Sequence, residues 1–394
     1  MKQFNRKLRS VQIDEDRRKK RKKAFLPALI LLAAVAAVIL LVIWSRSREK
    51  EYNAYDTVHS EQLAGESSAR YAAYGGGYII YDRDGARAYA ADGKQLWNAA
   101  YNLKNPIIAV CEPYAAVADK GNGQFYIIDG KGNISSFTVA GRLAAIEVAA
   151  QGVTAVLTTE DDRDHIYLYA PDSGQALVAI MGITKECGFP VAMALSQDGR
   201  KLVTSYLSLG NGKLESWVTF YNFGDVGQNY VDNMVGSYSF EGIVPEVAFI
   251  TNDMVLVGKD NGIVLYRMTE VPKALLTEDF NRQIRSMFYS RSYIGVVLKG
   301  GDSADEQLLL YRTDKAKKAL DIPLEYEYTG IYTAGDDIVL YGGQEMTILR
   351  KNGDLKFHMS FSKNVRQVLR VDDQEKYIVI GDAQADTIRL KRQK

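Results

Sequence analysis

At 394 residues the chain is long enough for one large all-β domain or for two average domains. Its composition is that of a globular protein, 47% hydrophobic and 25% charged, with 25 Tyr residues that favour β-strands. The net charge of +1 combines eleven Lys and Arg among residues 1–23 with an acidic remainder, 38 basic and 45 acidic residues after residue 44. Because a nucleic-acid-binding protein carries its basic excess on the folded domain, this distribution argues against nucleic acid as a partner.

A membrane segment is predicted at residues 24–44. This stretch, AFLPALILLAAVAAVILLVIW, has 21 uncharged residues and would be about 31 Å long as a helix. A cleaved signal peptide is the alternative, but its apolar run is usually about 7 to 15 residues and ends at a small-residue cleavage site. Here the run ends at Trp44 and is followed by Arg46 and Arg48. The prediction is therefore one uncleaved transmembrane helix.

The charges beside this segment predict its orientation. Residues 17–23 are seven consecutive basic residues, whereas only Arg46, Arg48 and Lys50 follow closely on the other side. Since basic flanks stay inside, residues 1–23 are predicted to be a cytoplasmic tail and the C-terminal domain to be extracytoplasmic, at the cell membrane. Residues 45–68 are interpreted as a polar linker.

Residues 69–394 are predicted to form a β-propeller. Eight pairs of short apolar runs, each pair joined by a polar Gly/Asp turn, recur along this region. Their mean spacing of about 43 residues is typical of a four-stranded blade. A pair of β-sandwiches is the alternative, but it gives no reason for a uniform spacing. The predicted fold class is all-β, a propeller of eight four-stranded blades, or seven if one terminal unit is incomplete.

The last repeat predicts how the ring closes. This eighth unit ends near Leu390 with only three strand-like runs. Residues 57–63 of the linker are therefore expected to supply the missing outer strand. Such closure removes a strand edge that would otherwise promote association.

Two turns carry a resemblance to known propellers. Residues 91–97 (ADGKQLW) resemble the repeat of quinoprotein-like propellers, including the lipoprotein that assists outer-membrane protein assembly, and residues 171–175 (PDSGQ) are a weaker match. The chain as a whole resembles a family of single-pass, membrane-anchored propellers of Gram-positive bacteria that has no established activity. The resemblance implies an architecture but no site.

The sequence departs from quinoprotein dehydrogenases where their cofactor binds. Those enzymes repeat a docking Trp in each blade, whereas only Trp97 and Trp217 lie outside the predicted membrane segment. Their vicinal Cys pair is also missing, because Cys111 and Cys187 are far apart. No cofactor is therefore expected. These two cysteines could form a disulfide in an extracytoplasmic compartment, or stay free.

No catalytic or metal-binding residues are predicted. His59, His165 and His358 are the only His residues, and no two have a metal-ligand spacing. The nucleophile motif Gly-x-Ser-x-Gly is absent from the sequence. Acidic pairs such as Asp161-Asp162 fall between strands, where Asp stabilises turns. Two carboxylates could still meet as in a glycoside hydrolase, which is the enzymatic alternative.

The predicted function is an extracytoplasmic binding or scaffolding module for a protein, peptide or cell-envelope component. A ligand-sensing subunit that signals through a membrane partner is the alternative, since 23 cytoplasmic residues cannot hold an output domain. The longest repeats are the fourth and fifth, and the connection after Phe220 is rich in Tyr, Asn, Ser and Gly, as recognition loops are. Tyr230, Asn233 and Tyr238 are the candidate binding residues. Alternatively, this connection is an outer strand whose Tyr residues pack on the next blade.

Overall fold

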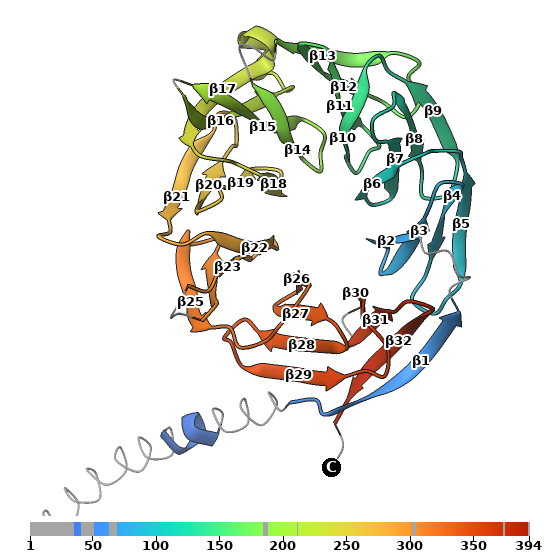
Figure 1. Ribbon diagram of the computed structural model, residues 1–394, viewed down its shortest axis with the longest axis vertical. Coiled ribbons are helices and arrows are strands. Elements are labelled where there is room, and N and C mark those ends of the chain that lie inside the picture. The colour runs from blue at the N-terminus through green and yellow to red at the C-terminus, as the bar shows by residue number, and fades with distance from the viewer. Residues whose placement is uncertain are drawn as a thin grey trace, which may run out of the picture. The chain divides into compact units, whose positions relative to one another are not determined.

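The computed structural model describes residues 35–40, 51–62, 69–183, 188–210, 212–301, 305–372 and 375–392. Residues Tyr52–Lys394 form one compact unit. It contains eight four-stranded antiparallel sheets arranged as the blades of a ring (Figure 1). The predicted all-β, eight-bladed propeller is confirmed, and the seven-bladed alternative is excluded.

Blades 1 to 7 each consist of four consecutive strands that run from the inner to the outer side of the ring. Blades 1 to 4 contain β2 (Arg70–Tyr74), β3 (Gly77–Tyr81), β4 (Gly85–Tyr89) and β5 (Gln95–Ala100); β6 (Pro106–Cys111), β7 (Tyr114–Asp119), β8 (Gln124–Ile128) and β9 (Ile134–Thr138); β10 (Arg142–Val148), β11 (Thr154–Glu160), β12 (Arg163–Tyr169) and β13 (Ala176–Ile183); and β14 (Phe189–Leu195), β15 (Lys201–Gly210), β16 (Lys213–Asn222) and β17 (Met234–Glu241). Blades 5 to 7 contain β18 (Glu246–Thr251), β19 (Met254–Gly258), β20 (Gly262–Arg267) and β21 (Lys273–Asp279); β22 (Ile284–Tyr289), β23 (Tyr293–Leu298), β24 (Gln307–Arg312) and β25 (Lys317–Pro323); and β26 (Gly330–Ala334), β27 (Asp337–Gly342), β28 (Glu345–Arg350) and β29 (Leu355–Ser360).

Blade 8 is built from both ends of the propeller. Its strands are, from inside to outside, β30 (Gln367–Asp372), β31 (Lys376–Ile380), β32 (Gln384–Lys391) and β1 (Ala54–Gln62). β1 pairs antiparallel with β32, with a bulge between Thr57 and His59 (Figure 1). The Tyr78 hydroxyl of blade 1 donates a hydrogen bond to Glu61 of β1 over 2.7 Å. The N-terminal strand therefore completes the last blade and contacts the first.

The hydrophobic core lies between neighbouring blades. Middle strands such as β7 are buried along almost their whole length, whereas the outer strand β9 alternates exposed and half-buried residues. Ile79 of blade 1 shares a cluster with Val117 of blade 2, and Ile80 shares another with Ile378 of blade 8. Each blade thus covers its faces with its neighbours, which is why the repeat spacing predicts the ring.

The predicted membrane segment, residues 24–44, lies outside the described residues except for residues 35–40, which are helical. Within the described ranges, no helix is both long and apolar enough to cross a membrane. The predicted cytoplasmic tail, residues 1–23, and Cys187 also lie outside these ranges.

Candidate functional site

Exposed apolar side chains gather on one side of the propeller. Eleven large apolar residues of blades 3 and 4 are exposed, against five in the other described parts of the propeller. The eleven are Leu177, Met181, Phe189, Val191, Leu209, Leu214, Trp217, Tyr230, Val231, Met234 and Tyr238. Because such concentrations mark interaction surfaces, this side is the candidate binding region.

A groove of about 320 Å³ lies in this region, between blades 3 and 4. We call it the outer groove. Its walls come from β12 and β13 on one side and from β15, β16, β17 and the preceding 3₁₀ turn on the other. The lining residues are Ile166, Ile180, Met181, Gly182, Tyr206, Trp217, Thr219, Tyr221, Asp232, Met234 and Ser237. A concave apolar lining with a few polar groups is typical of a binding site.

The local sequence of blade 4 explains why the groove forms there. β15 and β16 are ten residues long, whereas the middle strands of the other blades have five to eight. After β16 the chain does not turn directly into β17 but forms two 3₁₀ turns, η1 (Gly227–Asn229) and η2 (Val231–Asn233). Asp232 and Asn233 have φ angles of 51° and 60°, a left-handed conformation that Asp and Asn adopt more readily than most residues. These additions account for the greater length of the fourth and fifth repeats.

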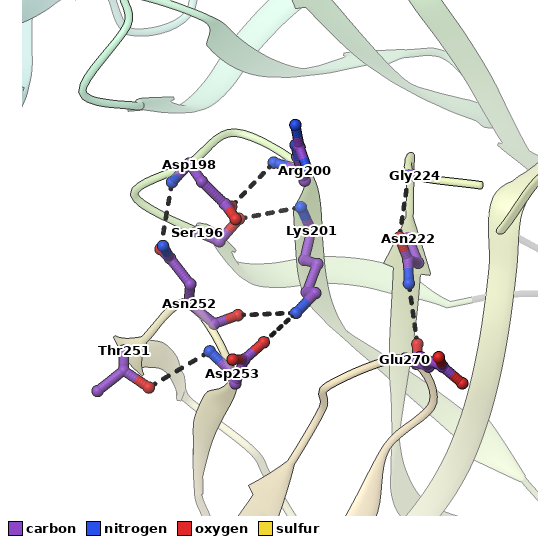
Figure 2. A network of polar contacts seen from close by, with 10 residues as sticks. All are labelled: Ser196, Asp198, Arg200, Lys201, Asn222, Gly224, Thr251, Asn252, Asp253 and Glu270. Atoms are coloured by element: carbon purple, nitrogen blue, oxygen red, sulfur yellow. Dashed lines mark hydrogen bonds and ion pairs between the residues drawn. The ribbon is translucent and has the colours of Figure 1, made fainter. Parts of the chain in front are cut away.

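Hydrogen bonds to blade 5 hold the start of this connection in place. The Asn222 side chain donates to the Glu270 carbonyl over 3.0 Å and accepts from the Gly224 amide over 2.9 Å (Figure 2). Gly227 then passes so close to Asn222 that a Cβ atom at position 227 would lie 1.5 Å from the Asn222 carbonyl oxygen. The start of the connection is therefore held against the end of β16 and blade 5.

A second polar network joins blade 4 to blade 5 at the β14–β15 turn (Figure 2). Lys201 is buried, donates to the Asn252 carbonyl over 3.2 Å and pairs with the carboxylate of Asp253. The Asp198 amide donates to the Asn252 side chain over 3.2 Å. This network therefore attaches the β14–β15 turn of blade 4 to the β18–β19 turn of blade 5.

The three predicted binding residues lie in different surroundings. Asn233 lies between Asp232 and Met234, which line the groove, and Tyr230, which is 44% exposed, lies two residues before Asp232. Tyr238 lies on the opposite face of β17 from Ser237: its ring stacks on Tyr266 of blade 5 with centroids 5.6 Å apart. Tyr238 therefore packs on the next blade, as the alternative interpretation expects. The binding role of Tyr230 and Asn233 stays a prediction.

The groove's main apolar residues were not predicted. Trp217 lies opposite Tyr206 in the β15–β16 ladder, and Met181 lies near the end of β13. The sequence offered one signal: β13 reads ALVAIMGI, without a charge, although it is an outer strand.

A larger hollow of about 820 Å³ between blades 6 and 7 is polar and less suited to a ligand. Its cation, Arg285, is already paired with Glu306 at 2.5 Å and lies 4.2 Å from the centre of the Tyr328 ring. His358, which also lines it, shares a hydrogen bond of 2.9 Å with Thr347. Arg285 and His358 are thus already engaged by other side chains of the propeller.

The inner strands carry carboxyl groups with perturbed acidity. Burial raises the pKa of Glu147, on β10, to about 7, and burial also raises the pKa of Glu246, on β18. Burial, followed by the charges of Glu246 and Glu147, raises the pKa of Tyr289 to about 12. In the part of the chain that the structure describes, no group of three or more His, Cys, Asp or Glu could hold a metal ion, and Cys111 is free.

The fold and the groove define the class: an eight-bladed β-propeller with an apolar groove at its outer edge. By sequence, residues 48–390 match the model of DUF5711, a family of unknown function, and the chain belongs to that family. No curated protein matches the chain.

Solved propellers share this fold at low sequence identity. Sqt1 of Saccharomyces cerevisiae is 14% identical with a TM-score of 0.57, over 87% of this chain and 100% of that one. Sqt1 of Chaetomium thermophilum, bound to the N-terminus of the ribosomal protein L10, is 12% identical with a TM-score of 0.57, over 86% and 100%. At these identities the likeness shows the fold alone.

Proposed function

We propose that this protein is a membrane-anchored, extracytoplasmic propeller that binds a partner protein or peptide in the outer groove. The observation that carries the proposal is the gathering of exposed apolar side chains on blades 3 and 4, where Met181, Trp217 and Met234 line one groove. Trp217, Tyr206 and Met181 belong to the residue types that are enriched at protein interfaces. No catalytic step is part of the proposal.

The charge around the groove favours a polypeptide with basic residues. Residues 213–241, which include β16, the connection and β17, contain Lys213 but four acidic residues, Glu215, Asp225, Asp232 and Glu241. Nucleic acid and anionic lipid would be repelled by this surface, whereas Lys and Arg beside an apolar segment would be attracted.

The remaining support comes from the sequence and from the fold. The apolar residues 24–44 and the basic run 17–23 support the anchor and its orientation. The Chaetomium thermophilum Sqt1 structure is a propeller with a bound protein N-terminus, which supports the use of this fold as a binding platform.

The proposal is tested by copurification after crosslinking in native membranes. The groove variant Trp217→Ala/Met234→Ser is compared with Leu96→Ser, a matched change of an exposed apolar residue on the outer strand of blade 1. We expect the groove variant to stay folded, with a melting temperature lowered by a few degrees because Trp217 is more than half buried, and to lose most of the crosslinked partner. The control should keep the partner. Equal yields from both variants would contradict the proposal.

A separate pair of changes tests the predicted residues of the connection. Tyr230→Ala and Asn233→Ala alter residues beside the groove, so each should lower partner yield without a comparable loss of stability. Tyr238→Ala should instead lower stability, because its ring packs on Tyr266.

A further inference from the structure

β13 differs from the other outer strands of the propeller. All eight of its residues, ALVAIMGI, are uncharged and none has a polar side chain. The outer strands β1, β17, β21, β25 and β29 each contain at least one charged residue, and β5 and β9 contain polar ones. Charges on an edge strand normally prevent pairing with another chain. β13 has no such protection.

The outer side of β13 has unused backbone groups. Among the described residues, β13 is the end strand of its sheet and is paired with β12 only. In an antiparallel sheet, every second residue of an end strand directs its N–H and C=O away from the sheet. Leu177 and Met181, on one face of β13, are 58% and 54% exposed. The strand therefore offers both hydrogen-bonding groups and apolar contacts.

The outer groove lies beside the second half of this strand. Ile180, Met181 and Gly182 form one wall, and Trp217 and Met234 of blade 4 belong to the other. A polypeptide strand added along β13 would place alternate side chains over the groove, on the face of Ile180, and the intervening side chains over Leu177 and Met181 on the opposite face. The backbone would supply affinity and the groove would select the side chains.

Acidic residues surround the end of β13. The β11–β12 turn contains Glu160, Asp161 and Asp162, and the register places Arg163, just after them, opposite Ile183 at the end of β13. On blade 4, Glu215 lies directly opposite Glu241, which also pairs with Lys213 at 3.6 Å, so this group keeps a net negative charge. Two copies of this chain paired through β13 would bring these like charges together and repel each other. An anionic membrane would be repelled by the same charges. An apolar segment with basic flanks is the complementary occupant.

We propose that a partner polypeptide binds blade 3 as a fifth strand, antiparallel or parallel to β13, with alternating apolar residues over the outer groove and Lys or Arg at its ends. The inference rests on the proposed function and specifies its binding mode. It predicts a backbone requirement that simple groove binding does not have.

Selection of peptides with the full-length chain in detergent tests this mode. Random phage-displayed peptides about as long as β13 are selected on the wild type and counter-selected on Leu177→Lys/Met181→Lys; Leu96→Lys on β5 is the matched control. Leu177, Met181 and Leu96 are all exposed, so these substitutions should not affect folding. We expect enriched peptides with alternating apolar residues and basic flanks that bind the double variant about tenfold or more weakly and the control normally.

N-methylation of the selected peptide then separates the binding modes. Strand addition requires that methylating every second amide abolishes binding, whereas methylating the intervening amides has little effect. If binding depends on Trp217 but shows no such alternation, the inference is wrong and the proposed function stands. If no peptide depends on either β13 or Trp217, the inference is wrong, and the crosslinking experiment decides the proposed function independently.

Two further measurements examine other occupants of the edge. Sedimentation of the wild type and of Leu177→Lys/Met181→Lys reports self-association, and flotation with phosphatidylcholine and phosphatidylglycerol vesicles reports lipid binding. We expect neither to differ between the two proteins. Dimers or vesicle binding that the double variant loses would overturn the inference.

Discussion

Removal of one aromatic ring from the N-terminal strand should loosen the last blade. Tyr55 of β1 is half-buried and packs on Phe361 with ring centroids 5.2 Å apart. If about half of the ring surface, on the order of 100 Å², is covered, its burial contributes about 2.5 kcal/mol. Tyr55→Ala should therefore weaken the attachment of β1 by about 2 to 3 kcal/mol. Val58→Ala is the matched control, because Val58 is 50% exposed at the bulge.

Hydrogen exchange of the full-length chain is the direct assay. A loss of 2.5 kcal/mol corresponds to about 70-fold faster exchange of the amides that pair β1 with β32. Exchange in blades 3 to 5 should not change, and the melting temperature should fall by about 3 °C if opening is global. If β1 and β32 exchange equally fast in Tyr55→Ala and Val58→Ala, the reasoning about ring closure is refuted.

Three further predictions concern the inner strands, the interblade network and the topology. Burial raises the pKa of Glu147 from 4.5 to about 7, so ionised Glu147 lowers stability above pH 7 and the cost disappears below about pH 4.5. Glu147→Gln should thus stabilise the protein by about 1 to 2 kcal/mol at pH 8 and have little effect at pH 4, measured by thermal unfolding; equal effects at both pH values would contradict this. Asp253→Ala should cost about 1 to 3 kcal/mol because it removes the partner of buried Lys201, and adding Lys201→Met should recover much of the loss; a simply additive double variant would argue against the pairing. Protease added to intact protoplasts should digest the propeller and spare residues 1–23, and a protected propeller would reverse the proposed orientation.

The fold was predictable because it depends on a repeated local pattern. Each repeat shows apolar runs separated by Gly/Asp turns, and a spacing of about 43 residues fits one blade. The closing strand was also predictable, since a last unit with three strands requires a fourth. The structure begins that strand at Ala54, three residues before the expected position.

The candidate site was only partly predictable. Sequence composition pointed to the connection after Phe220, but it could not tell that Tyr238 faces Tyr266 while Ser237 faces the groove. The groove itself depends on how far apart two neighbouring blades lie at their outer edges. That distance results from the packing of residues on different blades, such as Ile180 and Tyr221, which no local pattern reports.

The central claim, that a partner protein occupies the outer groove, is tested most directly by photocrosslinking from a residue at its edge. A photoreactive amino acid replaces Met181 in the full-length chain, and a second protein carries it at Leu96 on β5, which has similar exposure. After irradiation of native membranes, we expect one specific adduct from position 181, absent when Trp217→Ala is added, and no such adduct from position 96. Absence of an adduct at 181, or the same adduct from both positions, would contradict the account.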